Sequence, residues 1–333
     1  MLTKDQITEL FHGNLSDELK LDYLDRLSTD DSRNQGTFQA VTDSVRACLA
    51  PQAHGLFNAQ DLTDCCGTGG SGISHFNTST TVAFVLAAAG MKTAKFGNRA
   101  ASSQSGSFDL LDKLGVGATL DLEALPELLD ECDLTFLFAP QFYPALTKLA
   151  PIRKKLSKPT VLNFIGPLLN PAEPPYRLIG VPRRDAQILV AMSLQAGGKV
   201  KQALVVNAHS GLDELDGQCA STTIRISGKR EVQYGVLEAQ PDWSMAGKID
   251  RALTVEDNLA IFKALLDAEL GQANYYHNLV TLNAGAAMHV AGKTSNLAEG
   301  RQLAAHLLKS GQVKAKFIQY KTLHNRQKTC TQN

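Results

Sequence analysis

Residues 64–90, DCCGTGGSGISHFNTSTTVAFVLAAAG, join the end of an apolar strand to a helix through a loop rich in glycine and hydroxyl groups. In the apolar run that ends this stretch, aliphatic residues recur at helical spacing as far as Gly90, which can cap the helix in the left-handed conformation. Glycines let a loop fold into a nest of backbone amides around one anion, and a helix N-terminus adds positive potential. With Asn77, Ser79 and Thr80 at that terminus, the stretch predicts a strand, loop and helix that bind a phosphate.

Two common nucleotide-binding patterns do not fit this loop. Gly67, Gly69 and Gly72 satisfy the spacing GxGxxG of dinucleotide-binding folds. In those folds the helix opens at the glycines and an acidic residue ends the next strand, whereas here a polar segment intervenes and the next strand ends at Lys95 and Phe96. The Walker pattern GxxxxGK[ST] is absent from the sequence. A tight turn with a hydroxyl N-cap is a simpler interpretation, but it does not need so many donors.

The composition sets the class of protein. Of 333 residues, 44% are apolar and 20% are charged, and the 33 basic and 33 acidic side chains cancel. This balance gives no global field that would gather nucleic acid or an anionic membrane, so we expect neither as a partner. The N-terminus lacks the layout of a signal peptide, and no uninterrupted apolar run reaches the roughly 18 residues that span a bilayer. We therefore expect a soluble, cytoplasmic protein.

Six cysteines are scattered along the chain without CxxC spacing. In a chain of this length, that distribution argues against a disulfide framework and against a zinc site. We expect reduced and mostly buried thiols.

Strand and helix signals alternate after an N-terminal helical region. The pattern of the first fifty residues predicts short helices and no strand, and the second of these helices has a clear apolar stripe. A linker follows at 51–60. Short apolar runs separated by helix-length segments then predict strands at 61–66, 92–96, 134–139, 160–165 and 202–207. Residues 222–237 predict an antiparallel hairpin, 255–311 return to helix, and the polar tail 319–333 is expected to fray. The alternation predicts an α/β fold with a mainly parallel central sheet.

A second polar loop follows the strand at 92–96. The segment AKFGNRAASSQSGSFDLL, residues 94–111, supplies Lys95, Ser103 and Ser107 as further donors. Because the carboxyl ends of parallel strands meet at one edge of the sheet, both loops should face the same ligand. The two loops therefore predict a substrate with more than one phosphate.

An acidic pair follows a later strand. Asp213 and Glu214 lie in HSGLDEL, directly after the strand predicted at 202–207, and so at the same edge of the sheet. Carboxylate oxygens are the hard ligands that Mg²⁺ prefers. Two neighbouring acids on a loop are more often only solvated, and it is the GLDE context that favours a metal role here.

Five motifs in order give the chain a specific resemblance. GTGG, FNTST, KFGNRAASS, PIRKKLSKPTVLNFIGPLLNPA and GLDEL are similar to the pattern of the anthranilate phosphoribosyltransferase family, which has the type III phosphoribosyltransferase fold and is related to pyrimidine nucleoside phosphorylases. The resemblance covers roughly residues 60–230. It implies a pentosyltransferase that uses Mg²⁺ to transfer phosphoribose from phosphoribosyl pyrophosphate to anthranilate, an aromatic amine, in tryptophan biosynthesis. It also implies a homodimer formed through the N-terminal helices.

The resemblance assigns site residues in three groups, without a general acid or base. The predicted contacts of phosphoribosyl pyrophosphate are Gly67, Thr68, Gly70, Ser71, His75, Asn77, Thr78, Ser79, Thr80, Lys95, Ser103 and Ser107. The predicted contacts of the acceptor are Gly67, Asn98, Arg153, Phe96 and Tyr143, with Arg153 able to hold a carboxylate in a bidentate fork. The predicted metal ligands are Ser79, Asp213 and Glu214.

Several of these positions depart from the family pattern. Ser71 stands where an aspartate is usual, Phe96 and Tyr143 stand where histidines are usual, and Thr78 replaces an aliphatic residue. Phenylalanine can only stack against or exclude an acceptor, so the same donor chemistry on another aromatic acceptor is an alternative. A non-catalytic relative that binds nucleic acid or a partner is a second alternative, and phosphorolysis of pyrimidine nucleosides is a weaker third.

We predict two domains. A small all-helical domain spans residues 1–58 and is joined by a helical segment near 142–156. Residues 59–333 form the larger α/β domain, with the active site in the cleft between the two.

Overall fold

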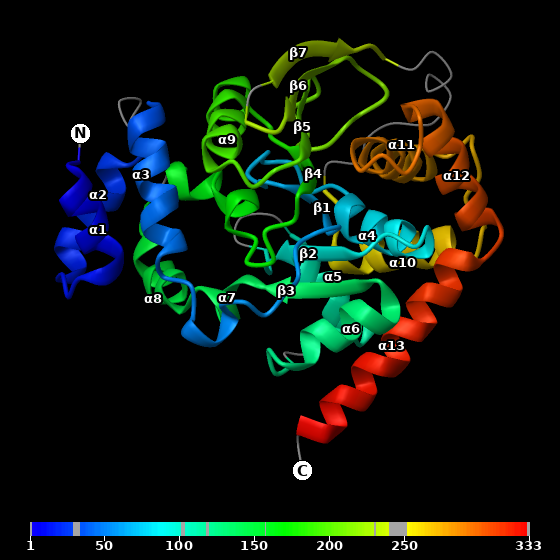
Figure 1. Ribbon diagram of the computed structural model, residues 1–333, viewed down its shortest axis with the longest axis horizontal. Helices are drawn as coiled ribbons and strands as arrows, with labels where there is room; N and C mark the ends of the chain where they lie inside the picture. The colour runs from blue at the N-terminus through cyan, green and yellow to red at the C-terminus, as the bar shows by residue number, and fades with distance from the viewer. Residues whose placement is uncertain are drawn as a thin grey trace.

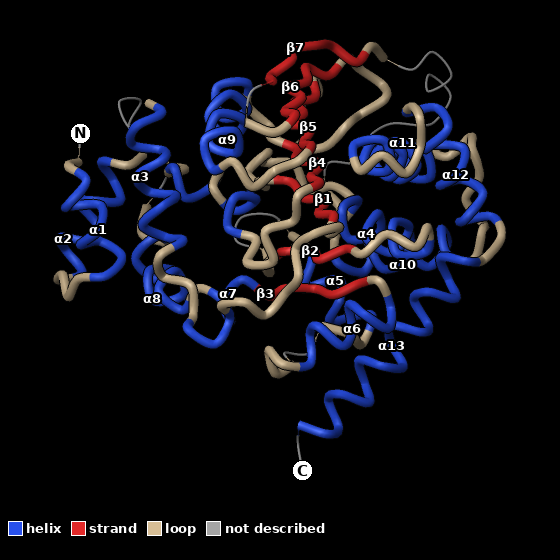
Figure 2. Tube along the Cα trace, viewed as in Figure 1, coloured by secondary structure: helices blue, strands red, loops and turns tan. Residues whose placement is uncertain are grey.

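The computed structural model describes residues 2–28, 34–100, 104–117, 120–156, 158–229, 231–239 and 252–331. A seven-stranded sheet in the order β3-β2-β1-β4-β5-β6-β7 forms its centre (Figure 2). The strands are β1 Thr63–Gly67, β2 Thr93–Gly97, β3 Leu134–Phe138, β4 Tyr176–Gly180, β5 Gln202–Ala208, β6 Ser221–Ser227 and β7 Glu231–Leu237. The first five strands are parallel, whereas β6 and β7 add as an antiparallel hairpin. This confirms the predicted α/β class and the mainly parallel sheet.

Helices cover both faces of this sheet. Figure 1 shows α9 on one side and α4 with α11 on the other. The helices are α1 Lys4–His12, α2 Asp17–Arg26, α3 Gln35–Arg46, α4 Thr78–Ala88, α5 Ser107–Leu114, α6 Ala124–Cys132, α7 Ala139–Phe142, α8 Pro144–Arg153, α9 Arg184–Gly197, α10 Val255–Leu266, α11 Tyr275–Val290, α12 Leu297–Lys309 and α13 Gln312–Thr331, with short 3₁₀ turns η2 Pro51–Ala53, η3 Val161–Asn163 and η4 Gly166–Leu169. None of the helices in the described part of the chain is long and apolar enough to cross a membrane.

The N-terminal helices pack together beside the sheet. Side chains of Thr3, Ser16 and Asn34 cap α1, α2 and α3, which explains where each helix begins. Helix α8, from the middle of the chain, packs against α1 and α2. The structure therefore has the small helical part beside the larger α/β part that was predicted, while the boundary at 58/59 stays a prediction.

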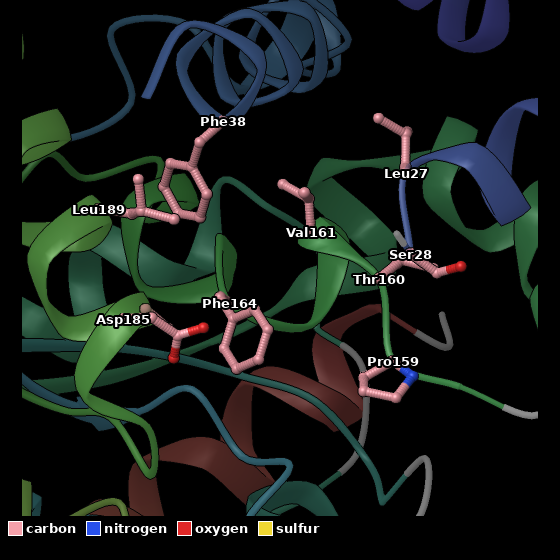
Figure 3. A pocket seen from close by; sticks show the side chains of 10 residues that line it. Leu27, Ser28, Phe38, Pro159, Thr160, Val161, Phe164, Asp185 and Leu189 are labelled. Atoms are coloured by element: carbon pink, nitrogen blue, oxygen red, sulfur yellow. The ribbon is translucent and has the colours of Figure 1, made fainter. Parts of the chain in front are cut away.

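The seam between the two parts is closely packed. Phe38 of α3 and Leu189 of α9 face each other across it, with Val161 and Phe164 nearby (Figure 3). The cavity that they line measures about 10 Å³. That volume holds about one water molecule, so this cavity is not a substrate site.

Two predictions about secondary structure were wrong. Residues 160–165 are not a strand: the Thr160 hydroxyl accepts the amide N–H of Leu162, the Asn163 carboxamide accepts that of Thr160, and this reciprocal cap starts the 3₁₀ turn η3. The fourth parallel strand is instead β4, which the sequence analysis missed. Second, the C-terminal tail does not fray as a whole but forms α13 up to Thr331.

Burial explains why the polar C-terminal stretch is helical. Val313, Tyr320 and His324 of α13 are at most 1% exposed. Tyr320 makes edge contacts with Phe84 of α4 and Phe136 of β3. A few aromatic and apolar anchors thus stabilise a helix whose overall composition is polar.

Candidate functional site

A pocket of about 530 Å³ opens at the carboxyl ends of the parallel strands. Its floor includes the terminal glycines of three strands, Gly67, Gly97 and Gly180. The strand order reverses between the neighbouring strands β1 and β4, from which the chain proceeds in opposite directions across the sheet. Ligands of open α/β sheets bind at such a switch point.

The glycine-rich loop after β1 forms one wall of the pocket. Gly69, Gly70 and Gly72 have φ values of 69°, 77° and 70°, the left-handed region in which other residues are strained. This lets the chain double back before it enters α4, where Asn77 is the N-cap. The Asn77 side chain does not cap the helix but donates to Ser105 Oγ at 2.8 Å. The cap position is therefore left without a side-chain acceptor, as expected where an anion is to bind.

Hydroxyls of the first turn of α4 also face the pocket. Thr80 is fully buried, and its Oγ1 has no hydrogen-bond partner among the described residues. Ser79 lines the same pocket and is partly buried. A buried hydroxyl without a partner is costly, so Thr80 is suited to bond a ligand oxygen.

The loop after β2 forms a second wall. Lys95 is 3% exposed and brings a buried ammonium to the pocket. Ser107 begins α5 and donates to the carbonyl oxygen of Asn98 at 3.1 Å. Ser103 lies outside the described residues. The described part of the loop thus adds a cation and hydroxyls opposite the glycine-rich loop.

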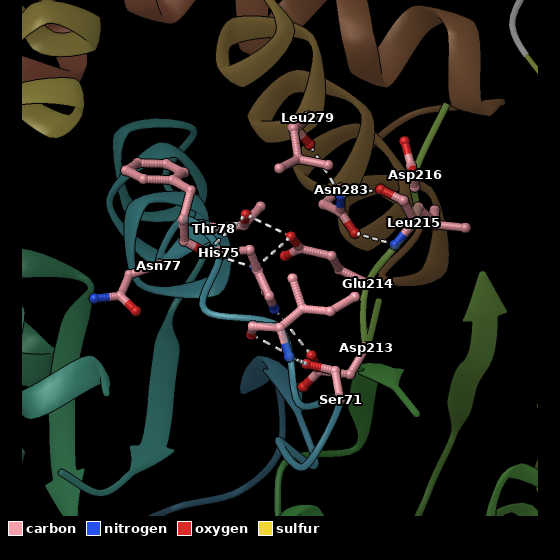
Figure 4. A network of polar contacts seen from close by, with 12 residues as sticks. Ser71, His75, Asn77, Thr78, Asp213, Glu214, Leu215, Asp216, Leu279 and Asn283 are labelled. Atoms are coloured by element: carbon pink, nitrogen blue, oxygen red, sulfur yellow. Dashed lines mark hydrogen bonds and ion pairs between the residues drawn. The ribbon is translucent and has the colours of Figure 1, made fainter. Parts of the chain in front are cut away.

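The acidic pair lies beside the glycine-rich loop, at the wall of the pocket (Figure 4). Asp213 accepts the amide N–H of Gly69 at 2.7 Å, and Glu214 accepts the Thr78 hydroxyl at 2.9 Å. His75 stands between them, with Nε2 3.1 Å from Asp213 Oδ1 and Nδ1 3.1 Å from Glu214 Oε1. Asn283 of α11 fixes the loop through Leu215, the residue after Glu214. Its Oδ1 accepts the Leu215 amide N–H at 3.0 Å, and its Nδ2 donates to the Leu215 carbonyl oxygen at 2.9 Å. The acids are therefore ordered and buried.

Electrostatics follow from this arrangement. Burial alone would lower the pKa of His75, but the facing carboxylates of Glu214 and Asp213 raise it well above its usual value. Burial would raise the pKa of Asp213, but hydrogen bonds from His75 and Gly69 lower it. Burial raises the pKa of Glu214. Both ring nitrogens of His75 face carboxylate oxygens, an arrangement that favours the protonated ring.

Two strand-end glycines make room for the acid loop. An added Cβ on Gly67 would overlap the carboxylate of Asp213, and one on Gly180 would overlap its backbone carbonyl. The loop can approach the ends of β1 and β4 only because both positions lack a side chain.

The residues predicted to hold the acceptor come from β2 with the loop after it, and from α7 and α8. Arg153 lines the pocket, half-buried, and its Nη2 donates to Asn163 Oδ1 at 3.5 Å. Burial lowers the pKa of its guanidinium, which nevertheless stays charged. Phe96 also lines the pocket at 7% exposure. The assignment of Tyr143 needs correction, because it lies behind Phe96 outside the pocket lining and its hydroxyl donates to the Leu169 carbonyl at 2.7 Å.

With that exception, the structure brings the described candidates to one pocket. It is lined by Gly67, Thr68, Gly70, Ser71, His75, Asn77, Thr78, Ser79, Thr80, Lys95, Phe96, Asn98, Ser107, Arg153, Asp213 and Glu214. Sequence reasoning missed Ser105, Asn283 and Asn258, which hold the loops in place. For Asn283 the signal was available, since an asparagine inside the apolar helix TLNAGAAM needs a buried partner.

The oxygen donors fit a magnesium ion. Asp213 and Glu214 are 9% and 7% exposed at the pocket wall, and Ser79 lines the same pocket. Among the described residues, no three or more His, Cys, Asp or Glu side chains form a group that could hold a metal ion alone. A cation here would need water and substrate oxygens as well, which is how Mg²⁺ commonly binds.

Comparison with known proteins agrees with this geometry. The family model described as "Glycosyl transferase family, a/b domain" matches residues 59–314. An anthranilate phosphoribosyltransferase of Bacillus cereus is 42% identical over 282 residues, 84% of this chain and 82% of that protein. The chain belongs to the anthranilate phosphoribosyltransferase family. A second member, from Laribacter hongkongensis, is 41% identical over 78% of this chain and 75% of its own length.

Solved structures of the family have the same fold. The anthranilate phosphoribosyltransferase of Thermus thermophilus superposes with a TM-score of 0.82 at 31% identity, over 97% of this chain and 94% of that one. The enzyme of Saccharomyces cerevisiae, in complex with PRPP and Mg, superposes with a TM-score of 0.79 over 96% of this chain and 91% of that one. At 24% identity this second likeness concerns the fold alone.

Proposed function

We propose that the protein transfers the phosphoribosyl group of phosphoribosyl pyrophosphate to anthranilate and releases pyrophosphate, a glycosyltransferase step of tryptophan biosynthesis. The observation that carries the proposal is the convergence of two donor-rich loops and a buried acid pair on one pocket at the sheet's switch point. Relatives of this activity at 40% identity or more over most of the chain support it.

The chain's own residues would act on the leaving group. Displacement at ribose C1 builds negative charge on pyrophosphate, so donors fixed in advance stabilise the transition state more than the ground state. Gly70, Ser71 and Gly72 of the glycine-rich loop, Thr80 and Lys95 line the pocket and would serve this purpose. When bound by Asp213 and Glu214 together with Ser79, Mg²⁺ would supply further neutralisation of the diphosphate.

On the acceptor side we assign binding and no proton transfer. The Arg153 guanidinium would hold the anthranilate carboxylate in a bidentate fork, with Asn98 nearby. An aromatic amine is already nucleophilic, so positioning against C1 is the main requirement. Phe96 would lie against the aromatic ring.

We further propose a cytoplasmic homodimer that assembles through α1–α3. The exposed apolar side chain of Leu19 in α2, at 38% exposure, supports this contact, whereas Ile7, Phe38 and Val41 are buried within the protomer. Sedimentation of the purified protein tests the dimer.

The test of the function is turnover. Purified protein with Mg²⁺, phosphoribosyl pyrophosphate and anthranilate should consume the fluorescent anthranilate and release pyrophosphate stoichiometrically. A panel of other aromatic amines serves as the comparison, because Phe96 changes the pocket wall. Turnover of another amine without turnover of anthranilate would refute the acceptor assignment, and no affinity for phosphoribosyl pyrophosphate would refute the whole proposal.

A further inference from the structure

A second cavity opens between α5, α10 and α13, and we call it the α5–α10–α13 groove. It measures about 330 Å³, near the lower end of the roughly 300–1,000 Å³ that small-molecule sites occupy. Ten described residues within 113–114, 262–267 and 314–321 line it, and none of these ten lines the pocket at the strand ends. The groove is therefore separate from the candidate active site.

The floor of the groove is apolar. Leu114, Phe262 and Leu266 line it and are buried, while Phe317 is partly buried. The rings of Phe262 and Phe317 meet edge to face, with their centroids 5.4 Å apart. Ile318 lines the same groove and is 55% exposed. The groove thus offers apolar and aromatic surface that a ligand of the same character can cover.

The rim of the groove is basic. Four lysines and one carboxylate line it: Lys113, Lys263, Lys314, Lys321 and Asp267. Lys314 pairs with Asp267 at 2.7 Å. Lys113 pairs at 2.8 Å with Glu256, which lies outside the lining. Two of the four ammonium groups are therefore compensated by carboxylates of the chain.

The other two lysines keep their charge available. Lys263 and Lys321 form no ion pair with a carboxylate in the described part of the chain. The Nζ atom of Lys321 is 5.9 Å from the centroid of the Phe317 ring and would lie 3.5 Å from a Cβ on Gly115. This side chain therefore reaches from α13 toward the end of α5. Two uncompensated cations beside apolar surface favour an anionic ligand.

The groove lies at the far ends of two helices that begin at the active site. Helix α5 starts at Ser107 in the active pocket and ends at Leu114 in the groove, a length of about 12 Å for eight residues. In α10, Asn258 Oδ1 accepts the amide N–H of Asn77 at 2.7 Å, whereas Phe262, one turn later, lines the groove. A ligand in the groove can therefore bind without entering the active pocket.

We propose that the α5–α10–α13 groove binds a small apolar anion, with an aromatic or branched apolar body and one carboxylate or sulfonate group. The body covers Phe262, Phe317 and Ile318, and the anionic group is held by Lys263 and Lys321. A protein partner fits less well, because ten lining residues are fewer than the roughly 20–30 that a stable interface uses on each side.

The test compares two fluorescent probes by titration into the purified protein. 8-Anilinonaphthalene-1-sulfonate is an apolar anion, and N-phenyl-1-naphthylamine has the same rings without the sulfonate. We expect the anionic probe to bind with a Kd of about 100 µM or lower and the neutral probe to bind at least about tenfold more weakly. Equal affinity for the two probes, or no binding of the anionic probe, would refute the proposal.

Variants locate the bound probe. Lys263→Gln combined with Lys321→Gln should raise the Kd of the anionic probe about tenfold and leave that of the neutral probe within about twofold. The matched control combines Lys293→Gln with Lys309→Gln, which makes the same change in net charge at two exposed lysines outside the groove. The control should keep the Kd of the anionic probe within about twofold.

Three results with the variants would overturn the inference. The first is an unchanged Kd in the groove variant, or an equal increase in the control. The second is loss of the anionic probe in Arg153→Ala but not in the groove variant, which would place the probe in the active pocket. The third is loss of self-association on Ile318→Glu in sedimentation, because a second copy of the chain would then cover the groove.

Discussion

Gly180→Ala should damage the site through the backbone of the acid loop. A Cβ at this position would overlap the backbone carbonyl of Asp213 and lie 2.8 Å from the amide nitrogen of Glu214, below the 3.0 Å that real Cβ contacts keep. These obstacles are backbone atoms, which cannot rotate away as a side chain would. The loop that carries both acids must therefore retreat by about 1 Å, a displacement that can cost about 100-fold in rate when it affects binding groups.

The effect should be mainly on catalysis. We expect kcat/KM for phosphoribosyl pyrophosphate to fall about 100-fold. Overpacking at a buried contact should also lower the free energy of unfolding by about 1–3 kcal/mol. Gly67→Ala should have a smaller effect, because its Cβ meets the carboxylate of Asp213 as well as its backbone, and a side chain can adjust.

The assays are steady-state kinetics with both substrates and urea unfolding. The matched control is Gly271→Ala, since a Cβ there meets nothing within 4 Å and the residue is exposed. It should keep full activity and change the free energy of unfolding by no more than about 1 kcal/mol. If Gly180→Ala kept the kcat/KM of the unsubstituted protein, close approach of the acid loop to β4 would not be needed, and the argument would fail.

Three further predictions concern the acceptor, the core and the thiols. Arg153→Ala should raise the KM for anthranilate about 100-fold and leave the dissociation constant of phosphoribosyl pyrophosphate within about twofold. Arg153→Lys should restore little, because a lysine lacks the planar fork. Equal losses of affinity for both substrates would contradict this role. Phe84→Ala should lower the free energy of unfolding by about 3–5 kcal/mol, because its buried ring contacts aromatic residues of β3, α10 and α13. The control Ile318→Ala, at a 55% exposed site, should lower the free energy of unfolding measured in urea by less than about 1 kcal/mol. Cys65 and Cys66 should resist alkylation by iodoacetamide at pH 8 in the native protein. Burial raises the pKa of Cys65 to about 12 and that of Cys66 well above its usual value. Rapid modification of either thiol, detected by peptide mapping, would contradict that burial.

Local patterns sufficed for most elements of this fold because each element carries its own signal. The strand ending at Gly67 and the helix that begins at Thr78 follow from an apolar run, a glycine loop and helical spacing. Local patterns failed where side chains override hydrophobicity. Residues 160–165 are apolar enough for a strand, yet the cap between Thr160 and Asn163 turns the chain, and the true strand β4 lies just after a proline pair.

The C-terminal helix α13 failed as a prediction for a different reason. Its polar composition gives no amphipathic signal, and it is Tyr320 that anchors it against distant elements, with the buried His324 beside it. Such an anchor cannot be read from the segment itself, because its partners Phe136 and Phe84 lie 184 and 236 positions earlier in the chain. The signal exists only in the folded protein.

The same distance limits what a motif can say about the site. Resemblance brought Asp213 and Glu214 to the glycine loop, but it gave no reason to pair them with His75, which lies 138 and 139 positions earlier. Taken alone, a single histidine beside a phosphate loop suggests a donor to the substrate. The folded chain instead directs both ring nitrogens to the carboxylates, so the charge of this site depends on three residues together: substituting any one of them changes the electrostatic environment of the other two.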